Sequence, residues 1–251
     1  MKFLNRILGL VSFSTILPLH IHSSIQEMSK LTWLWPLIGG FIGIIIGTLG
    51  FTLINIIHLP QLIAAGLIYS FAIWFTGFHH LDGLIDFGDG MMVHGDSRRR
   101  IEVMRDQRIG TGGLAYLFMV AIITFASIAT IPAIIVFPIL FISEISAKVG
   151  LVTCCTFSKP FEDGTGRFFI NAMNMKKLFL ILIITLFIGF LTLKTVGILG
   201  IIGGLTGGLI ITFVARKNFN KATGDVLGTS NEVSRMIALI IMILFTTGLI
   251  I

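Results

Sequence analysis

The feature that most constrains the fold is the contrast between one charge-dense stretch and the apolar sequence on both sides of it. Residues 79–113, HHLDGLIDFGDGMMVHGDSRRRIEVMRDQRIGTGG, contain six of the 12 acidic residues of the chain and five arginines. Only 12% of the 251 residues are charged, against about 25% in soluble proteins. The mean hydropathy is +0.99. The sequence therefore predicts an all-α, polytopic membrane helical bundle, with its chemistry in polar loops.

Seven apolar segments are long enough, or nearly so, to cross a membrane as helices, since a span needs about 20 residues. We expect them at 31–57, 61–78, 114–131, 132–153, 178–193, 197–214 and 236–251. The last is short unless it begins before Arg235. Residues 3–17 are too short to span and predict a helix at the membrane interface or a re-entrant piece. The whole chain, 1–251, is expected to form a single membrane domain.

In this arrangement three polar loops, 79–113, 155–177 and 215–235, fall on the same side of the membrane as the N-terminus. Of the 18 basic residues, only Lys148, inside a span, and Lys194, in an opposite turn, lie elsewhere. Basic residues favour the cytoplasmic side of a membrane protein. The sequence thus predicts a multi-pass protein of a prokaryotic cell (inner) membrane, with its active face towards the cytoplasm.

The formal net charge of +6 does not indicate nucleic-acid binding. In a membrane protein, excess Lys and Arg reflects cytoplasmic loops and anionic lipid headgroups, and we interpret Arg98–Arg100 as a headgroup anchor. Cys154 and Cys155 are adjacent and provide no disulfide framework. Membrane lipid is therefore an expected partner, nucleic acid is not, and the sequence leaves open whether the chain forms a homo-oligomer.

Three aspartates, Asp82, Asp86 and Asp89, follow the spacing i, i+4, i+7. On a helix this spacing puts the three carboxylates on one face, where they repel each other unless a cation lies between them. Carboxylate oxygens are the ligands that Mg²⁺ prefers, and Mg²⁺ commonly shares its coordination shell with substrate phosphates. We expect a Mg²⁺ site here; the alternative is a solvated acidic helix end.

Two histidines at the mouth of the second expected span, His79 and His80, are candidates for proton transfer. A lone histidine at a membrane interface is usually structural. Beside Asp82, however, one of the two could donate to a phosphate or act as a general base.

Arg105 and Arg108 flank Asp106 just before the sequence GTGG, 110–113. Exposed backbone N–H groups in such a glycine-rich turn are suited to hold phosphate. We therefore expect the two arginines and the turn to form an anion-binding site; a surface role for the arginines is the alternative.

Two further features are weaker signals. Glu144 and Lys148 are spaced i, i+4 inside a span, where charges are costly and usually paired or functional; we expect them to pair with each other. Residues 223–225, Thr-Gly-Asp, form a small-residue turn that bears a carboxylate, a common pattern in proteins.

Three sequence blocks resemble the cobalamin synthase family, also called adenosylcobinamide-GDP ribazoletransferase. They are HHLDGLIDFGDG at 79–90, RRRIEVMRDQRIGTGG at 98–113 and TGDVLG at 223–228. The similarity runs from residue 3 to about residue 235. The residues that match the motifs of the family are His80, Leu81, Asp82, Gly83, Leu84, Asp86, Asp89, Gly90, Glu102, Met104, Arg105, Asp106, Arg108, Gly110, Thr111, Thr223, Gly224, Asp225, Leu227 and Gly228.

Two positions depart from the pattern of that family. Lys148 stands where an arginine is expected, and Ser158-Lys159 stands where Ala-Arg is expected. Lysine cannot make a bidentate contact with phosphate.

The resemblance implies a membrane transferase of late cobalamin (vitamin B12) biosynthesis, and the aspartates predict that it is Mg²⁺-dependent. In this reaction α-ribazole, or its 5′-phosphate, reacts with adenosylcobinamide-GDP and releases GMP. Our hypothesis is that Asp82, Asp86 and Asp89 hold one or two Mg²⁺ ions on the diphosphate, and that His80 or Asp106 accepts the proton of the attacking hydroxyl. The residues that would bind substrate or phosphate are Arg105, Arg108, Glu102, Gly110, Thr111, Thr223, Gly224 and Asp225.

Two other functions remain open from the sequence. A CDP-alcohol phosphotransferase shares the membrane setting and an Asp-Gly start, but its D-G-x-x-A-R pattern would need Ala and Arg at Asp86 and Phe87. An ion or metal transporter could use Glu144 and Lys148 at depth. Transport sites usually lie near the bilayer midplane, whereas most acidic residues here lie at the expected cytoplasmic edge.

Overall fold

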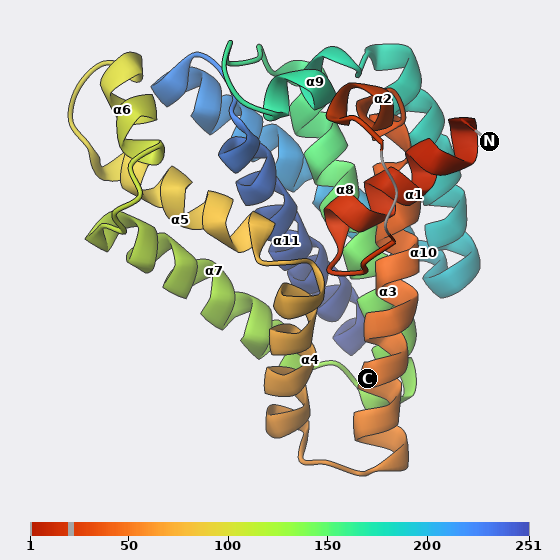
Figure 1. Cartoon of the computed structure of the whole chain (residues 1–251). Helices are drawn as coiled ribbons and strands as arrows, with labels where there is room; N and C mark the ends of the chain where they lie inside the picture. The colour runs from red at the N-terminus through yellow and green to blue at the C-terminus, as the bar shows by residue number, and fades with distance from the viewer. Residues whose placement is uncertain (1, 20–22, 251) are drawn as a thin grey trace.

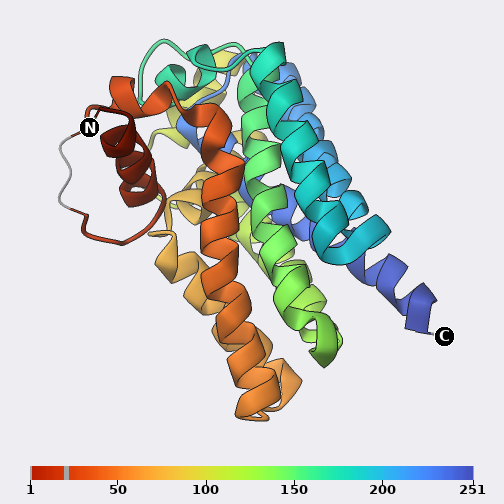
Figure 2. The same ribbon diagram turned by 90° about the vertical axis from the view of Figure 1, so that its right-hand side faces the viewer.

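The computed structural model describes residues 2–19 and 23–250, which form a bundle of helices (Figures 1 and 2). The α-helices are α1 (Lys2–Ser14), α2 (Ile25–Ser29), α3 (Trp35–Phe51), α4 (Gln61–Phe75), α5 (His79–Met92), α6 (Ser97–Met104), α7 (Thr111–Ala129), α8 (Val136–Phe157), α9 (Gly166–Asn171), α10 (Met175–Phe219) and α11 (Gly224–Ile250). Short helical turns of other types are η1 (Thr32–Leu34), η2 (Thr52–Ile56) and η3 (Ala133–Ile135). The all-helical fold expected from the sequence is confirmed.

Five helices of the described chain are long and apolar enough to cross a membrane, or up to six if the bent pair α4 and α5 counts as one span. The chain is therefore a multi-pass membrane protein. The sequence predicted seven spans because it divided the 45 residues of α10 in two and counted 61–78 as a span, whereas α4 has only 15 residues. That division has a structural counterpart: Leu193 and Lys194 leave helical geometry, and α10 folds back on itself there (Figure 2).

Helix α8 is the centre of the bundle and is buried along most of its length. It packs against α3, α10 and α11. Glycines permit this close packing: a methyl group built on Gly43 of α3 would lie 2.7 Å from the carbonyl oxygen of Phe141 in α8. Small residues at helix interfaces have this role in lipid, because tight backbone approach increases van der Waals contact.

The N-terminal helix α1 is too short to be a candidate span, as the sequence predicted for 3–17. It packs beside the beginning of α3, where the indole N–H of Trp35 donates to Oγ of Ser14 at 2.8 Å. The structure thus brings Phe13, at the end of α1, next to the polar end of the bundle.

Two of the expected loops are largely helical. The stretch 79–113 contains α5, α6 and the beginning of α7, and most of 215–235 belongs to α10 and α11. The expectation of a loop at 224–235 was wrong because its polar residues are buried in the bundle and bond to other helices. Helix α11 therefore begins before Arg235, which gives the last span its full length.

Candidate active site

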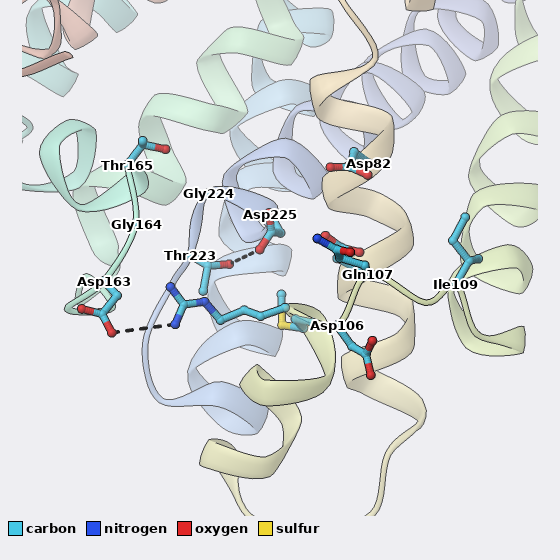
Figure 3. Close-up of a pocket in the computed structure, with 13 residues that line it drawn as sticks. Asp82, Asp106, Gln107, Ile109, Asp163, Gly164, Thr165, Thr223, Gly224 and Asp225 are labelled. Atoms are coloured by element: carbon cyan, nitrogen blue, oxygen red, sulfur yellow. Dashed lines mark hydrogen bonds and ion pairs between the residues drawn. The ribbon is translucent and has the colours of Figure 1, made fainter. Parts of the chain in front are cut away.

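A pocket of about 510 Å³ opens at the end of the bundle where the three polar stretches of the sequence meet (Figure 3). It is lined by Asp82, Asp86, Met104, Arg105, Asp106, Gln107, Ile109, Asp163, Gly164, Thr165, Thr223, Gly224 and Asp225. Seven of these were predicted as site residues: Asp82, Asp86, Arg105, Asp106, Thr223, Gly224 and Asp225. The fold therefore brings together segments that are more than a hundred residues apart.

Helix α5 reaches this pocket because the chain bends by 91° between α4 and α5. Gly77 and Phe78 form the bend with positive φ angles of 69° and 61°. Glycine adopts such angles at little cost, whereas a bulky residue such as Phe78 does so only where its surroundings enforce it. The bend turns an amphipathic helix, whose polar face carries the aspartates, towards the open end of the bundle.

Asp82 and Asp86 of α5 meet Asp225 of α11 across a very close helix contact. A methyl group built on Gly83 would lie 2.8 Å from both Cα and O of Asp225, so only glycine fits there. Oγ1 of Thr229 donates to the carbonyl oxygen of Gly83 at 3.0 Å and holds the two helices together. Three carboxylates from two helices therefore line one pocket.

This set of donors fits Mg²⁺ that is shared with a substrate. Among the described residues, no group of three or more His, Cys, Asp or Glu side chains is arranged to hold a metal by itself. Mg²⁺ commonly takes only one or two carboxylates from the protein and completes its shell with water and substrate phosphates. Asp82 is exposed in the pocket, Asp86 and Asp225 are half-buried, and Oδ2 of Asp225 also accepts from Oγ1 of Thr223 at 3.0 Å.

Asp89, the third aspartate of the predicted metal site, does not line the pocket. Its side chain is buried, and its two oxygens accept hydrogen bonds from the backbone N–H groups of Gly110 and Gly113, each at 2.7 Å. It therefore caps the N-terminus of α7, where a negative charge is favourable. Asp89 lies on the same face of α5 as Asp82 but two turns further along, where the beginning of α7 covers it. In the pocket, the third carboxylate beside Asp82 and Asp86 is that of Asp225.

The glycine-rich turn that the sequence predicted to bind phosphate forms the N-terminus of α7. The N–H of Gly110 is occupied by Asp89, and Thr111 begins α7. Neither residue lines the pocket. The turn 110–113 is thus a capped helix N-terminus that is filled by a carboxylate of the same chain.

Arg105 reaches from the end of α6 to the second polar loop. Its Nη1 lies 3.8 Å from Oδ2 of Asp163, and its guanidinium carbon lies 5.1 Å from the centre of the Phe161 ring. That loop is joined to the third one by two backbone hydrogen bonds: Phe161 donates to Ala222 at 2.9 Å, and Ala222 donates to Lys159 at 2.8 Å. These two hydrogen-bonded loops therefore hold Arg105 at the wall of the pocket.

Asp106 and Arg108 pair with each other at the exposed rim. Nη2 of Arg108 lies 2.8 Å from Oδ2 of Asp106, and this hydrogen bond lowers the pKa of the Asp106 carboxyl. In Figure 3 the Asp106 carboxylate points away from Asp82 and Asp225. Arg108 does not line the pocket, and neither does Glu102, which pairs with Arg98 and Arg99.

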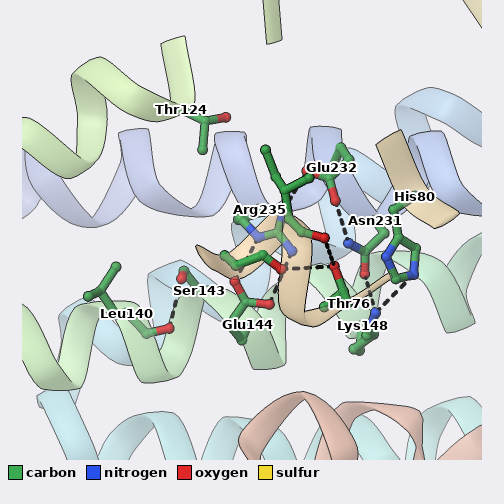
Figure 4. A network of polar contacts seen from close by, with 12 residues as sticks. Thr76, His80, Thr124, Leu140, Ser143, Glu144, Lys148, Asn231, Glu232 and Arg235 are labelled. Atoms are coloured by element: carbon green, nitrogen blue, oxygen red, sulfur yellow. Dashed lines mark hydrogen bonds and ion pairs between the residues drawn. The ribbon is translucent and has the colours of Figure 1, made fainter. Parts of the chain in front are cut away.

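His80 lies behind the pocket, at the end of a buried polar network (Figure 4). Its Nε2 is 3.0 Å from Nζ of Lys148, and Lys148 also donates to Oδ1 of Asn231 at 2.9 Å. Asn231 donates in turn to Oε1 of Glu232 at 3.0 Å. Since the ammonium group of Lys148 is a donor only, Nε2 of His80 accepts from it, which occupies the nitrogen that would take up a proton.

The expected pairing of Glu144 with Lys148 was wrong. Glu144 instead accepts two hydrogen bonds from the guanidinium of Arg235, at 2.7 and 3.1 Å, and Arg235 also pairs with Glu232. Glu144 and Arg235 lie on α8 and α11, and both are almost fully buried. Because these charges are paired within the bundle, they do not form the open intramembrane ion site that a transporter would need.

Six lining residues were missed by sequence reasoning: Met104, Gln107, Ile109, Asp163, Gly164 and Thr165. A signal for three of them was present, because the loop sequence EDGTG, 162–166, combines a carboxylate with glycines as the predicted turn 223–225 does. The two turns lie side by side: a methyl group on Gly166 would lie 2.7 Å from the backbone nitrogen of Gly224.

The fold and the site define an integral membrane protein of the helical-bundle class with a carboxylate-lined pocket at its polar end. Comparison with known proteins shows the family to which the chain belongs. The model of the cobalamin-5-phosphate synthase family matches residues 6–243, and the chain belongs to that family.

Among its relatives is a protein of Methanosarcina barkeri that is 30% identical over 92% of this chain and 88% of its own length. A relative from Methanococcoides burtonii is 31% identical over 89% of this chain and 86% of its own length, and one from Thermococcus kodakarensis is 30% identical over 94% and 97%. All three are named adenosylcobinamide-GDP ribazoletransferase. No solved structure matches the chain.

Proposed function

We propose that the protein is a transferase that joins α-ribazole, or its 5′-phosphate, to adenosylcobinamide-GDP and releases GMP. The proposal rests on membership of the family and on the names of the relatives. The observation of the site that best supports this proposal is that Asp82, Asp86 and Asp225 line a single pocket with Arg105. Acidic side chains that gather with an arginine at the polar end of a membrane bundle suit a diphosphate bridged to the protein by Mg²⁺.

In the proposed reaction a ribose hydroxyl of the acceptor attacks the phosphorus that carries the cobinamide unit. The P–O bond to the other phosphate breaks, GMP leaves with the bonding electrons, and the hydroxyl proton passes to water in the open pocket. Mg²⁺, when bound, supplies charge neutralisation on the diphosphate. Asp82, Asp86 and Asp225 would hold it, and Arg105 would bind the phosphate of the departing GMP, with charge-assisted hydrogen bonds.

The two residues predicted to accept the proton, His80 and Asp106, are poorly suited to do so. Nε2 of His80 is occupied by Lys148, and the carboxylate of Asp106 is bound to Arg108. Phosphoryl transfer depends more on positioning and charge neutralisation than on a strong base. We therefore infer that His80 positions α5 against α8, and that Asp106 shapes the rim of the pocket together with Arg108.

We further propose that this pocket faces the cytoplasm of a prokaryotic cell. The polar loops that surround it are rich in Lys and Arg, which favour that side of the membrane. The water-soluble acceptor would then enter from the cytoplasm, and the donor would approach along the membrane surface.

The test is product formation by the purified protein in detergent or nanodiscs, supplied with adenosylcobinamide-GDP, α-ribazole and Mg²⁺. We expect equal amounts of GMP and of the joined corrinoid, measured by mass spectrometry, and neither product when either substrate is left out. GMP release without the acceptor would show hydrolysis rather than transfer. Absence of the joined product from folded protein with both acceptor forms would contradict the proposal.

A further inference from the structure

A second cavity of about 250 Å³ lies beside the carboxylate pocket and differs from it in chemistry. Three aromatic rings from distant parts of the chain form one end of it: Phe13 of α1, Trp35 of α3 and Phe169 of α9. The centres of the Trp35 and Phe169 rings are 4.6 Å apart, and those of Phe13 and Phe169 are 5.2 Å apart. Leu151 adds a further apolar side chain to the wall.

The one polar atom of these three aromatic side chains, the indole nitrogen of Trp35, already has a hydrogen-bond partner. The indole N–H of Trp35 donates to Oγ of Ser14, so the rings present faces and edges without a free donor. At the opening, the ring of His79 lies nearly parallel to that of Phe13, at 9° and 6.1 Å between centres. Such a surface favours a flat, apolar ring, because stacking on aromatic side chains requires no hydrogen bond from the ligand.

The two cavities adjoin each other. Asp82, Thr165, Gly224 and Asp225 line both of them. Gly224 leaves the passage open, since a methyl group built on it would meet nothing within 4 Å. A ligand with a flat ring at one end and a sugar hydroxyl at the other could therefore occupy the aromatic cavity and reach the carboxylates.

We infer that the aromatic cavity binds the heteroaromatic base of the acceptor nucleoside and so directs its ribose towards Asp82 and Asp225. This inference rests on the proposed function. A benzimidazole base has no exocyclic donors or acceptors and loses little when it is buried against Trp35 and Phe169. His80 also lines the cavity, and its Nδ1 is buried without a hydrogen-bond partner. This one group cannot pair all the donors and acceptors on the polar edge of guanine, so burying guanine against the aromatic end would cost several hydrogen bonds. The corrin ring is far larger than the cavity.

The test measures equilibrium binding of α-ribazole to the purified protein without the donor, by calorimetry. Phe13→Leu keeps an apolar side chain but removes the ring, and we expect it to weaken α-ribazole binding by about tenfold, as expected for the loss of one stacking contact. The KM for adenosylcobinamide-GDP should stay within about twofold of that of the wild type. Phe179→Leu, on the exposed face of α10, is the matched control and should leave both values unchanged.

A second comparison does not depend on the folding of a variant. The wild-type protein should bind α-ribazole at least about tenfold more tightly than the same sugar carrying adenine, whose amino group would be unpaired against the aromatic end of the cavity. Equal affinity for the two nucleosides, or unchanged α-ribazole binding by folded Phe13→Leu protein, would overturn the inference. If the wild-type protein forms product while either of these results is obtained, the inference fails and the proposed function stands. If it forms no product, the proposed function fails.

Discussion

At the scale of single residues, the interior of the bundle contains a balanced set of charges. Glu144, Lys148, Glu232 and Arg235 are each at most 3% exposed, and two are acidic and two basic. Removing charges from water is expensive, and an unpaired buried charge is much more costly than a paired one. The network therefore holds α8 and α11 in one register only as long as its charges remain balanced.

Substitution of Lys148 tests this balance. We expect Lys148→Met to leave one uncompensated negative charge in the bundle and to lower stability by about 3–5 kcal/mol. Lys148→Met combined with Glu232→Gln should recover part of this loss, because the remaining Glu144 and Arg235 still form a neutral pair. Thermal unfolding of the protein in detergent provides the measurement. Lys176→Met, at an exposed position, is the control, and a double variant no more stable than Lys148→Met would refute the charge-balance account.

The residue scale also shows what the sequence could predict. Helical periodicity is local, so the sequence could predict that Asp82 and Asp86 lie on one helix face, and both line the pocket. Asp225 was predicted to bind substrate or phosphate because its turn matches a motif, and it lines the same pocket. The partner of Glu144 could not be found in this way, since Arg235 is 91 positions away in sequence and Lys148 stands at the helical spacing where a partner is usually sought. The EDGTG sequence was a signal for Asp163, but its contact with Arg105 depends on the fold.

At the scale of helices, the position of α5 decides the geometry of the site. The bend after α4 turns it towards the open end of the bundle, Gly83 brings it against α11, and Asp89 attaches it to the beginning of α7. One face of a single helix thus carries two functions: Asp82 and Asp86 line the pocket, and Asp89 stabilises the fold.

Asp89→Asn separates these two functions. The amide keeps the shape of the side chain but loses its charge and one acceptor, so we expect a loss of about 1–2 kcal/mol of stability from the weaker cap of α7. The Mg²⁺ concentration that gives half-maximal turnover should not change, because Asp89 does not line the pocket. Unfolding midpoints and Mg²⁺ titrations of the same preparation would show both effects. If the Mg²⁺ requirement rose as strongly as in Asp82→Asn, Asp89 would be a ligand after all.

Helix boundaries were predictable where composition changes sharply. The break at Lys194 was found because one basic residue interrupts a long apolar run. The beginning of α11 was missed because 224–235 is polar in sequence yet buried, and the pattern of a buried polar network resembles that of a loop. The bend between α4 and α5 depends on φ angles that the sequence signals only through Gly77.

At the scale of the whole molecule, the connections from α8 through α9 to α10 and from α10 to α11 lie at one end of the bundle (Figure 1). Residues of these connections line the polar pocket. The first arm of α10 runs from this end to the turn at Lys194. Its length of about 27 Å, at 1.5 Å per residue, matches the hydrocarbon core of a bilayer. Lys176 and Lys194 should therefore lie on opposite sides of the membrane.

Cysteine labelling of intact cells tests this topology. Lys194→Cys should react with a membrane-impermeant maleimide added outside, and Lys176→Cys should react only after the cells are permeabilised. The wild-type protein provides the background, which should be low because Cys154 and Cys155 are both buried. Labelling of Lys176→Cys in intact cells would place the pocket on the outer side and contradict the proposed cytoplasmic orientation.

The central claim is that Asp82, Asp86 and Asp225 bind the diphosphate of the donor through a divalent cation. Its most direct test is Mn²⁺ binding, as a probe for Mg²⁺, followed by electron paramagnetic resonance with adenosylcobinamide-GDP present. We predict that the donor tightens Mn²⁺ binding to the wild-type protein and that Asp82→Asn with Asp86→Asn weakens it by at least about tenfold, or ~1.4 kcal/mol. Undiminished Mn²⁺ binding and turnover in that double variant would contradict the claim.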